Sequence, residues 1–470
     1  MAHWPDAVGN GYIIPFRWNY IQNSLTFKYL RRGVKMKFSL VNSGGIFITL
    51  CVVLAATVLP SQAQTFDRES QMGPDPVLPE PNSYLIPPMK VAKPVGWHNG
   101  EVPKVPAGFK IEAIGTGFSH PRQPYVLPNG DILIVESNSP GLEKVTRPKT
   151  IVMGLIIGSA GASEKTENRI TIIHNGKTSV FLNGLYSPFG VVLVGNDLYI
   201  ANTDSIMRYS YKDGNQSITE PGQKLTDLPG GPIDHHWTKS LTVSPDGTKL
   251  FVGIGSNSNV MENGAGAELD RAQIWEVDRA TGAHRTFASG LRNPNGLTFY
   301  PGSQTLWAVI NERDELGPNL VPDYMTSIKD GAFYGWPYSY YGQHLDPRVY
   351  PQRPDLVAKA IVPDYALSSH VAPLGLAFDT GDNFPDTYKG GAFIGEHGSW
   401  DRDEFNGYQV GFIAFNNGKP TGKVVPFVTG FLSDSLEAHG RPVGVAFDNA
   451  GTLIIADDLG NTVWRVSANK

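Results

Sequence analysis

The stretch Pro294-Asn295-Gly296-Leu297-Thr298-Phe299 leads, after a short turn, to Leu306-Trp307-Ala308-Val309. A small or proline-bearing turn, an apolar strand, a Gly/Asn/Asp turn and a second apolar strand follow one another here, which is the pattern of a strand pair. The same order occurs five more times. The other copies are Pro124–Leu127 with Ile132–Val135, Pro188–Leu193 with Leu198–Ile200, Leu241–Gly247 with Leu250–Val252, Pro373–Phe378 with Ala392–Ile394, and Pro442–Phe447 with Leu453–Ile455.

The repeat predicts an all-β fold, a six-bladed β-propeller. Equivalent positions recur at intervals of 50 to 79 residues, as expected for blades built from strand pairs. Further strands, such as Arg169–Ile173 and Gln273–Val277, complete the blades. The frequent Gly (52) and Pro (36) fit many short strands joined by turns. An array of β-sandwiches would not explain why the same turn precedes the same strand.

The first hundred residues are organised differently. Met36-Lys37, an apolar run from Ile46 to Leu59 and Ser61-Gln62-Ala63 have the order of a secretory signal peptide. We therefore predict an upstream extension at 1–35, a signal peptide at 36–63, an extended Pro-rich leader at 64–104 and the propeller at 105–470. The mature protein would be periplasmic or secreted, with no stable membrane insertion; an N-terminal membrane anchor is the alternative reading of the apolar run.

Charge and cysteine content exclude several classes of protein. The chain has a formal net charge of -5, and the basic residues 1–37 leave the rest near -10, which argues against a nucleic-acid partner. Cys51 is the only cysteine. A disulfide framework, a zinc–cysteine site and a covalently attached c-type haem are therefore excluded.

Polar residues recur just before the first strand and just after the second strand of each pair. Because such loops converge on one end of a propeller's channel, we expect a shared funnel. The residues before the strands are Arg122, Tyr186, His235-His236, Arg292-Asn293, His370 and His439-Gly440-Arg441. Those after the strands are Glu136, Asn202, Asp204, Asn257, Asn311-Glu312, Glu396-His397 and Asp457-Asp458.

This funnel has the chemistry of a site for an anionic ligand. Converging arginines need an anion or facing carboxylates, and a histidine titrating near neutrality could act as a general base. Adjacent residues of an extended chain point opposite ways, so we expect only one of His235 and His236 to face the cavity. A structural ring of salt bridges around the channel is the alternative.

Several stretches resemble the soluble quinoprotein sugar dehydrogenases, which use pyrroloquinoline quinone (PQQ) and calcium. Within that family, the chain most resembles the sorbosone dehydrogenase branch. This likeness is carried by the His-His-Trp-Thr and Asn-Glu-Arg-Asp segments. The resemblance covers residues 105–467, a six-bladed propeller in that family. It is carried by Gly290–Leu297, His236–Leu241, Gly317-Pro318, Asp330–Pro337 and Arg441-Pro442-Val443.

The resemblance implies roles for individual residues. His236 would take the proton from a substrate hydroxyl while a hydride passes to the quinone, and Arg292 would contact the quinone oxygens. The carbonyls of Gly317 and Pro318 would hold calcium, which prefers oxygen ligands. Further cofactor contacts would come from Asn293, Lys239, Arg402 and Arg441, and substrate contacts from Asp234 and His235.

The implied activity is oxidation of a sugar or sugar aldehyde, of the aldose or L-sorbosone type. Since the chain has no haem attachment site, electrons would pass to an external acceptor, a cytochrome or a quinone. The sequence departs from the family at Ser187–Gly190, where a glutamine is expected, at His235, where an aspartate is expected, and at His439, where an arginine is expected. These departures concern sugar binding more than quinone binding, and the sequence leaves the oligomeric state open.

Two other functions fit the pattern. The first is a calcium-dependent lactonase or hydrolase, in which Asn202, Asn293, Asn311 and Asp457 would bind the metal. The arginines of the same funnel argue against it, because they would repel a metal bound deep in the channel. The second is a propeller that binds a ligand without catalysis.

Overall fold

The computed structural model describes residues 67–82, 89–98, 100–141 and 166–469. The predicted extension, the signal peptide, Cys51 and most of an insert between the second and third strands of the first blade lie outside these ranges. Within them, no helix is long and apolar enough to cross a membrane.

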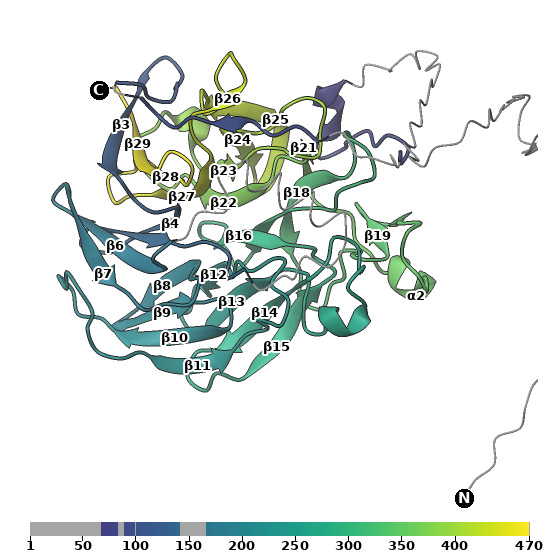
Figure 1. The fold of residues 1–470 in the computed structure, drawn as a ribbon, viewed down its shortest axis with the longest axis horizontal. Helices are drawn as coiled ribbons and strands as arrows, with labels where there is room; N and C mark the ends of the chain where they lie inside the picture. Colours follow the sequence, from purple (N-terminus) through teal and green to yellow (C-terminus); the bar gives the residue numbers. More distant parts are fainter. Residues whose placement is uncertain (1–66, 83–88, 99, 142–165, 470) are drawn as a thin grey trace, which may run out of the picture. The chain divides into compact units, whose positions relative to one another are not determined.

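Six antiparallel sheets are arranged around a common axis, which confirms the predicted six-bladed β-propeller (Figure 1). We number the blades 1 to 6 in chain order from β4. Blades 1 to 3 comprise β4 (Pro121–Val126), β5 (Ile132–Glu136), β6 (Arg169–His174) and β7 (Lys177–Leu182); β8 (Gly190–Val194), β9 (Asp197–Ala201), β10 (Ser205–Ser210) and β11 (Gln223–Asp227); and β12 (Leu241–Val243), β13 (Lys249–Ile254), β14 (Gln273–Asp278) and β15 (His284–Ser289).

Blade 4 has an added strand, blade 5 is regular, and blade 6 takes one strand from before blade 1. They comprise β16 (Pro294–Phe299), β17 (Leu306–Ile310), β18 (Pro322–Ile328) and β21 (Tyr365–Ser369), with β1 (Met72–Gly73) at the edge; β22 (Pro373–Phe378), β23 (Ala392–Glu396), β24 (Gln409–Asn416) and β25 (Lys419–Val428); and β27 (Pro442–Phe447), β28 (Leu453–Asp457), β29 (Thr462–Ala468) and β3 (Phe109–Thr116). The outer strand of blade 6, β3, therefore comes from before blade 1 and closes the ring.

The innermost strands are β4, β8, β12, β16, β22 and β27, and each contacts the next around the ring and back to β4. The glycine of the repeated motif lies where these strands approach most closely. A Cβ at Gly296, where φ is +56°, would lie 2.9 Å from the backbone nitrogen of Leu376 on the next inner strand. Similar conflicts would arise at Gly190 with Leu241 and at Gly375 with Val443. The motif needs glycine because backbone meets backbone there.

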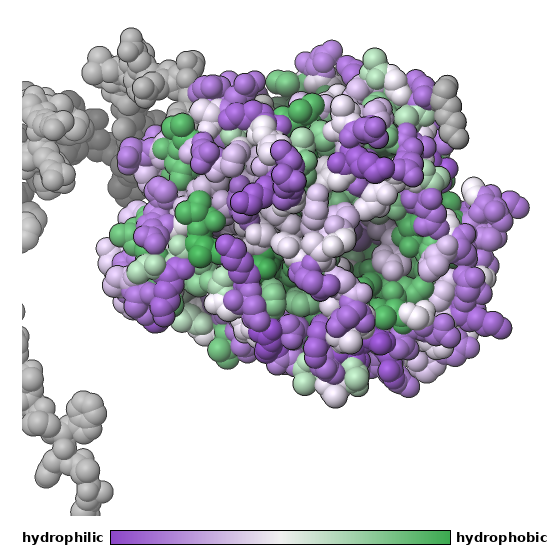
Figure 2. Space-filling view, turned by 180° about the vertical axis from the view of Figure 1, so that it is seen from behind, coloured by the Kyte–Doolittle hydropathy of each residue, from purple (hydrophilic) through white to green (hydrophobic). Residues whose placement is uncertain are grey.

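The hydrophobic core lies between neighbouring blades. Between blades 2 and 3, for example, Tyr199 and Val252 are completely buried and Trp275 nearly so. Strands such as Ile132–Glu136 are buried along their whole length, because blades cover both faces of each sheet. The face shown in Figure 2 is mostly hydrophilic, with separate hydrophobic patches.

Two segments outside the repeat dock on the ring. The leader contains the 3-10 helix η1 (Arg68–Gln71), β1 and β2 (Lys93–Pro94), which pairs with β26 (Glu437–Ala438). The insert of blade 4 carries the short strands β19 (Ser339–Tyr340) and β20 (His344–Leu345) and the single-turn helix α2 (Pro354–Val357). Two further 3-10 helices are η2 (Ala265–Glu268) and η3 (Asp386–Tyr388).

The blade 4 insert is held by a buried ion-pair network. Arg313 is completely buried; its guanidinium pairs with Glu312 at 2.9 Å and Asp346 at 3.2 Å and donates to the carbonyls of Pro337 and Ser339. Because all these groups are buried together, the insert fixes the loop after β17.

Candidate active site

A cavity of about 480 Å³ lies at the end of the ring where the inner strands begin. It is lined by residues before inner strands and after second strands, as the repeat predicts. The titratable residues among its lining are Arg122, Asp234, His235, His236, Arg292, Glu312, Asp314, Asp323, His370, His397, Tyr408 and Arg441. One part of the wall is cationic and another acidic.

His236 is held in the protonation state of a general base. Its Nδ1 lies 2.9 Å from the carbonyl oxygen of Ser256 and 3.0 Å from Ser256 Oγ. A carbonyl only accepts, so Nδ1 carries the hydrogen and Nε2 is the basic nitrogen. Burial and the neighbouring Arg292 guanidinium hold the pKa of His236 well below its ordinary value. The ring is therefore neutral at pH 7 and able to take a proton.

The neighbours of His236 are divided between the cavity and the interior. His235 and Asp234 line the cavity with His236, so the expectation that only one histidine faces it is wrong. Residues 234–239 lie in loop and turn rather than in an extended strand, so alternation does not apply. Lys239 lies outside the cavity lining: it is completely buried, donates to the Trp237 carbonyl at 3.0 Å, and burial lowers its pKa well below the ordinary value.

Arg292 contributes charge to the cavity, but its donors are already engaged. The guanidinium donates to the carbonyl and Oδ1 of Asn259 at 3.2 and 3.0 Å and to the Glu312 carbonyl at 2.7 Å. It also lies 3.5 Å from the Asp314 carboxylate. The adjacent Asn293 offers a free acceptor, since its buried Oδ1 has no hydrogen-bond partner among the described residues.

Arg441 is a cation of the cavity with an unused donor, its buried Nε. Its backbone N–H donates to Asp457 Oδ1 at 2.8 Å, and its guanidinium lies 5.8 Å from the Tyr408 ring centroid. The buried Nε has no partner, and no carboxylate of the described chain lies within ion-pair distance of the guanidinium. A buried unpaired cation is costly, so this position is suited to an anionic ligand.

Arg122 completes the cationic wall, and it shares the Asp458 carboxylate with His397, whose pKa is lowered by burial. Asp458 accepts from Arg122 Nη1 at 2.7 Å and from His397 Nε2 at 3.0 Å. Arg122 also lies 5.5 Å from the Trp237 ring centroid. The repeat indicated both cavity residues, which occupy a pre-strand and a post-strand position, but sequence reasoning gave neither of them a role.

Asp314, His370 and Asp401 form a cluster at the acidic wall. One ligand atom from each lies within 4.8 Å of the others. His370 Nδ1 is 3.3 Å from Asp314 Oδ1, and its Nε2 is 3.3 Å from the Gly317 carbonyl. Burial lowers the pKa of His370, but Asp314 outweighs it and the net pKa is raised. This cluster could hold a divalent cation, and two carboxylates suit a hard one.

Besides Lys239, three residues assigned by resemblance lie outside the cavity lining. Arg402 is buried and donates to Ser369 Oγ at 2.9 Å and Asn319 Oδ1 at 3.1 Å. The Gly317 carbonyl accepts from Leu320 N–H and contacts His370, which places it beside the acidic cluster. The Pro318 carbonyl accepts from Ser369 Oγ at 3.3 Å.

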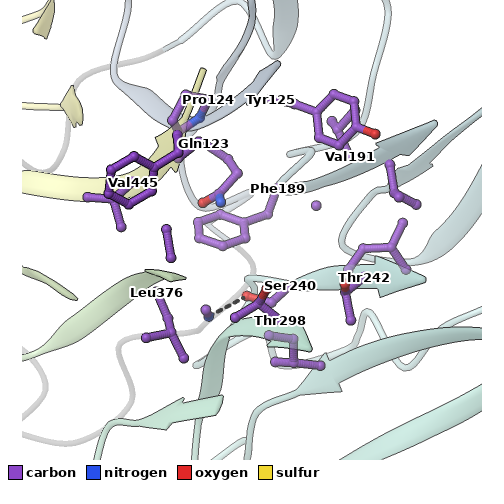
Figure 3. Close-up of a pocket in the computed structure, with 18 of the residues that line it drawn as sticks. Gln123, Pro124, Tyr125, Phe189, Val191, Ser240, Thr242, Thr298, Leu376 and Val445 are labelled. Carbon is purple, nitrogen blue, oxygen red and sulfur yellow. Dashed lines mark hydrogen bonds between the residues drawn. The ribbon is translucent and has the colours of Figure 1, made fainter. Parts of the chain in front are cut away.

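A second cavity of about 290 Å³ lies further along the inner strands, in the central channel (Figure 3). Figure 3 shows Phe189, Val191, Leu376 and Val445 around it, with Ser240 Oγ accepting from the Gly296 N–H at 3.2 Å. Its lining contains no histidine, carboxylate, lysine or arginine. Of these two cavities, the one at the strand starts is therefore the better candidate for an active site.

Comparisons with known proteins agree with this architecture. An uncharacterized protein of Borreliella burgdorferi is 29% identical over 380 residues, covering 78% of this chain and 91% of that protein. The PQQ domain of pyranose dehydrogenase from Coprinopsis cinerea, in its holo form, has a TM-score of 0.63 at 19% identity, covering 80% of this chain and 100% of that one. A calcium structure of the Trichoderma reesei carbohydrate-active enzyme of family AA12 has a TM-score of 0.61 at 19% identity, covering 81% and 99%. The family profile described as TrAA12-like matches residues 103–328 and 356–469. The chain therefore belongs to the TrAA12-like family.

Proposed function

We propose that this protein is a PQQ- and calcium-dependent oxidoreductase that oxidises a sugar or sugar aldehyde. The observation that carries the proposal is that a neutral His236 shares one cavity with three arginines, Arg122, Arg292 and Arg441. The family membership and the pyranose dehydrogenase and AA12 structures of similar fold support the same class. The narrower aldose or L-sorbosone assignment rests on sequence resemblance.

The cavity residues fit the quinone. Arg441 has a buried Nε without a partner, Asn293 has a buried acceptor without a partner, and Arg122 and Arg292 add positive charge. These groups would hold the three carboxylates and the carbonyl oxygens of PQQ. Trp237, Trp400 and Tyr408 supply apolar wall for its rings. Lys239 and Arg402, which do not line the cavity, would support it indirectly.

The acidic cluster fits calcium better than a pair of main-chain carbonyls alone. We assign the carboxylates of Asp314 and Asp401 as calcium ligands. The Gly317 carbonyl contacts His370 of the same cluster and would lie next to the ion. Hard oxygen donors are what calcium prefers. Pro318, whose carbonyl accepts from Ser369, would take part less directly.

The protein's own part in the reaction is positioning and proton transfer. When bound, PQQ supplies the electrophilic quinone that accepts a hydride, and calcium supplies Lewis-acid polarisation. His236 Nε2 takes the proton of the substrate hydroxyl, while Ser256 keeps the ring oriented through Nδ1. His235 and Asp234, on the same loop, would bind the substrate. The electrons would then pass to an external acceptor, a cytochrome or a quinone, in the periplasm or outside the cell.

The test is reconstitution. Purified protein without cofactor is given calcium and PQQ, and dye reduction is followed with a panel of aldoses and L-sorbosone, beside a His236→Ala variant. We expect activity that requires PQQ and is lost in the variant. Failure to bind PQQ together with calcium-dependent lactone hydrolysis would replace the proposal by the hydrolase. The four hydrolase ligands considered above are not gathered: Asn293 and Asn311 line the cavity, whereas Asn202 and Asp457 do not.

A further inference from the structure

Leader residues 93–96 pack against the segment 437–441, which includes Arg441. β2 pairs in parallel with β26, and the N–H groups of Val95 and Gly96 donate to the Ala438 carbonyl at 2.9 and 3.3 Å. His439 Nδ1 donates back to the Gly96 carbonyl at 2.9 Å. Leader residues 93–96 therefore contact residues 437–439, which lead into β27 at the cavity.

Trp97 connects the leader to the backbone of Arg441 through one carboxylate. Its ring stacks on His439 with centroids 5.2 Å apart. Its Nε1 donates to Asp457 Oδ2 at 2.6 Å, while Asp457 Oδ1 accepts the Arg441 N–H at 2.8 Å. Asp457 is completely buried, so each of its hydrogen bonds restrains its position.

The leader also reaches the cavity directly. Val91 belongs to the lining, and the Lys90 N–H donates at 3.0 Å to the carbonyl of Trp400, another lining residue. The match to the TrAA12-like family begins only at residue 103. These contacts therefore come from a segment outside the family's matched region.

We propose that leader residues 90–97 are part of the cofactor site, with Trp97 a positioning residue that holds Arg441 for an anionic cofactor. This inference rests on the proposed function, in which Arg441 meets a carboxylate of PQQ. Because the buried Nε of Arg441 has no partner in the described chain and the guanidinium is held there only by its contact with Tyr408, a firmly held backbone helps to set its direction. Asp457 Oδ2 accepts from two indoles, Trp97 at 2.6 Å and Trp464 at 3.2 Å, so changing Trp97 removes the shorter of these two bonds and leaves the Arg441 backbone freer.

The test is the affinity of the cofactor-free protein for PQQ in the presence of calcium, measured by equilibrium titration. Trp97→Phe keeps the ring but removes the N–H donor. We expect a Kd about tenfold higher, the effect of weakening one charge-assisted hydrogen bond. The matched control is Trp275→Phe, since Trp275 also donates through Nε1, to Gln273 at 3.2 Å, and stacks on a histidine, His284, but in blade 3 outside the cavity lining. This control should bind PQQ like the wild type.

A double-mutant cycle separates positioning from general loosening. In an Arg441→Ala background, Trp97→Phe should change the Kd by less than twofold, because the group it positions is gone. If the Trp97→Phe protein melts below the titration temperature, His439→Phe replaces it, as it keeps the ring stack and loses the bond to Gly96.

The outcomes distinguish the two proposals. If the wild type does not bind PQQ, the proposed function fails. If the wild type and Trp97→Phe bind PQQ equally well, the positioning role fails while the proposed function stands. The same conclusion follows if Trp97→Phe raises the Kd for PQQ as much in the Arg441→Ala background as in the wild type.

Discussion

Replacing His236 by asparagine should abolish most turnover and leave the fold intact. The amide nitrogen of asparagine can take the place of Nδ1 and donate to the Ser256 carbonyl, now 2.9 Å from the histidine. The fold then loses the second contact, to Ser256 Oγ, and the ring contact with His235, at a cost of about 1 to 2 kcal/mol. The variant has no equivalent of Nε2. Loss of a general base lowers turnover by about 10²- to 10⁴-fold, equivalent to about 3 to 5 kcal/mol of barrier.

The assay is dye-linked oxidation by PQQ- and calcium-loaded protein, with PQQ affinity and melting temperature measured on the same samples. His284→Asn, on the outer strand of blade 3, controls for the loss of an imidazole. Because burial and Arg292 lower the pKa of His236, wild-type turnover should persist as the pH falls through the ordinary histidine range and decline only below it. A folded, PQQ-binding His236→Asn protein with turnover within about threefold of wild type would refute the assignment of the base.

Three further changes test other parts of the structure. Arg313→Met leaves the buried carboxylate of Glu312 without its ion-pair partner and leaves Asp346 with Arg348 alone, and it should lower the free energy of unfolding by about 3 to 5 kcal/mol, measured by urea denaturation. Burial raises the pKa of Asp458, but His397 and Arg122 outweigh burial and hold the net pKa well below its ordinary range. The ionised Asp458 therefore stabilises the fold fully above its unfolded-state pKa near 4, and this stabilisation is lost as the pH falls below that value. Asp458→Asn should therefore be about 3 kcal/mol less stable than wild type at pH 7, with a gap that narrows below pH 4; a gap independent of pH would contradict this. Asp401→Asn should weaken calcium binding by at least about tenfold in isothermal titration, whereas Asp403→Asn, at an exposed neighbouring position, should not; equal affinities would remove Asp401 from the metal site.

The fold was predictable because the repeat records a backbone constraint. The motif glycines, such as Gly190 and Gly296, lie where inner strands come too close for a Cβ, so the pattern recurs with the geometry. The location of the cavity followed from the same repeat, and His236, Arg292, Asn293 and Arg441 do line it.

The sequence could not predict which side chains form hydrogen bonds and ion pairs with one another in the cavity. Arg292 and Arg441 both lie just before an inner strand, but only the structure shows that the donors of Arg292 are engaged while the buried Nε of Arg441 has no partner among the described residues. The cluster of Asp314, His370 and Asp401 draws its members from three separate loops, and spacing along the chain carries no signal for such a cluster. The leader appeared to be an extended segment with little core of its own, since a single tryptophan in a Pro-rich stretch does not indicate where it docks.

The pairing of β3 with β29 has a consequence for how the protein forms. Thr116 on β3 lies opposite Thr462 on β29, at nearly the two limits of the propeller sequence. During synthesis, β3 is made early but cannot pair until β29, the last strand of the ring, has been made. Contacts between such distant residues form slowly, because the loop between them must close first. Until then, β29 and β3 each present an unpaired edge to other chains. We expect the rate of maturation to depend on this final pairing, and circular permutation that joins β3 directly to β29 should accelerate it.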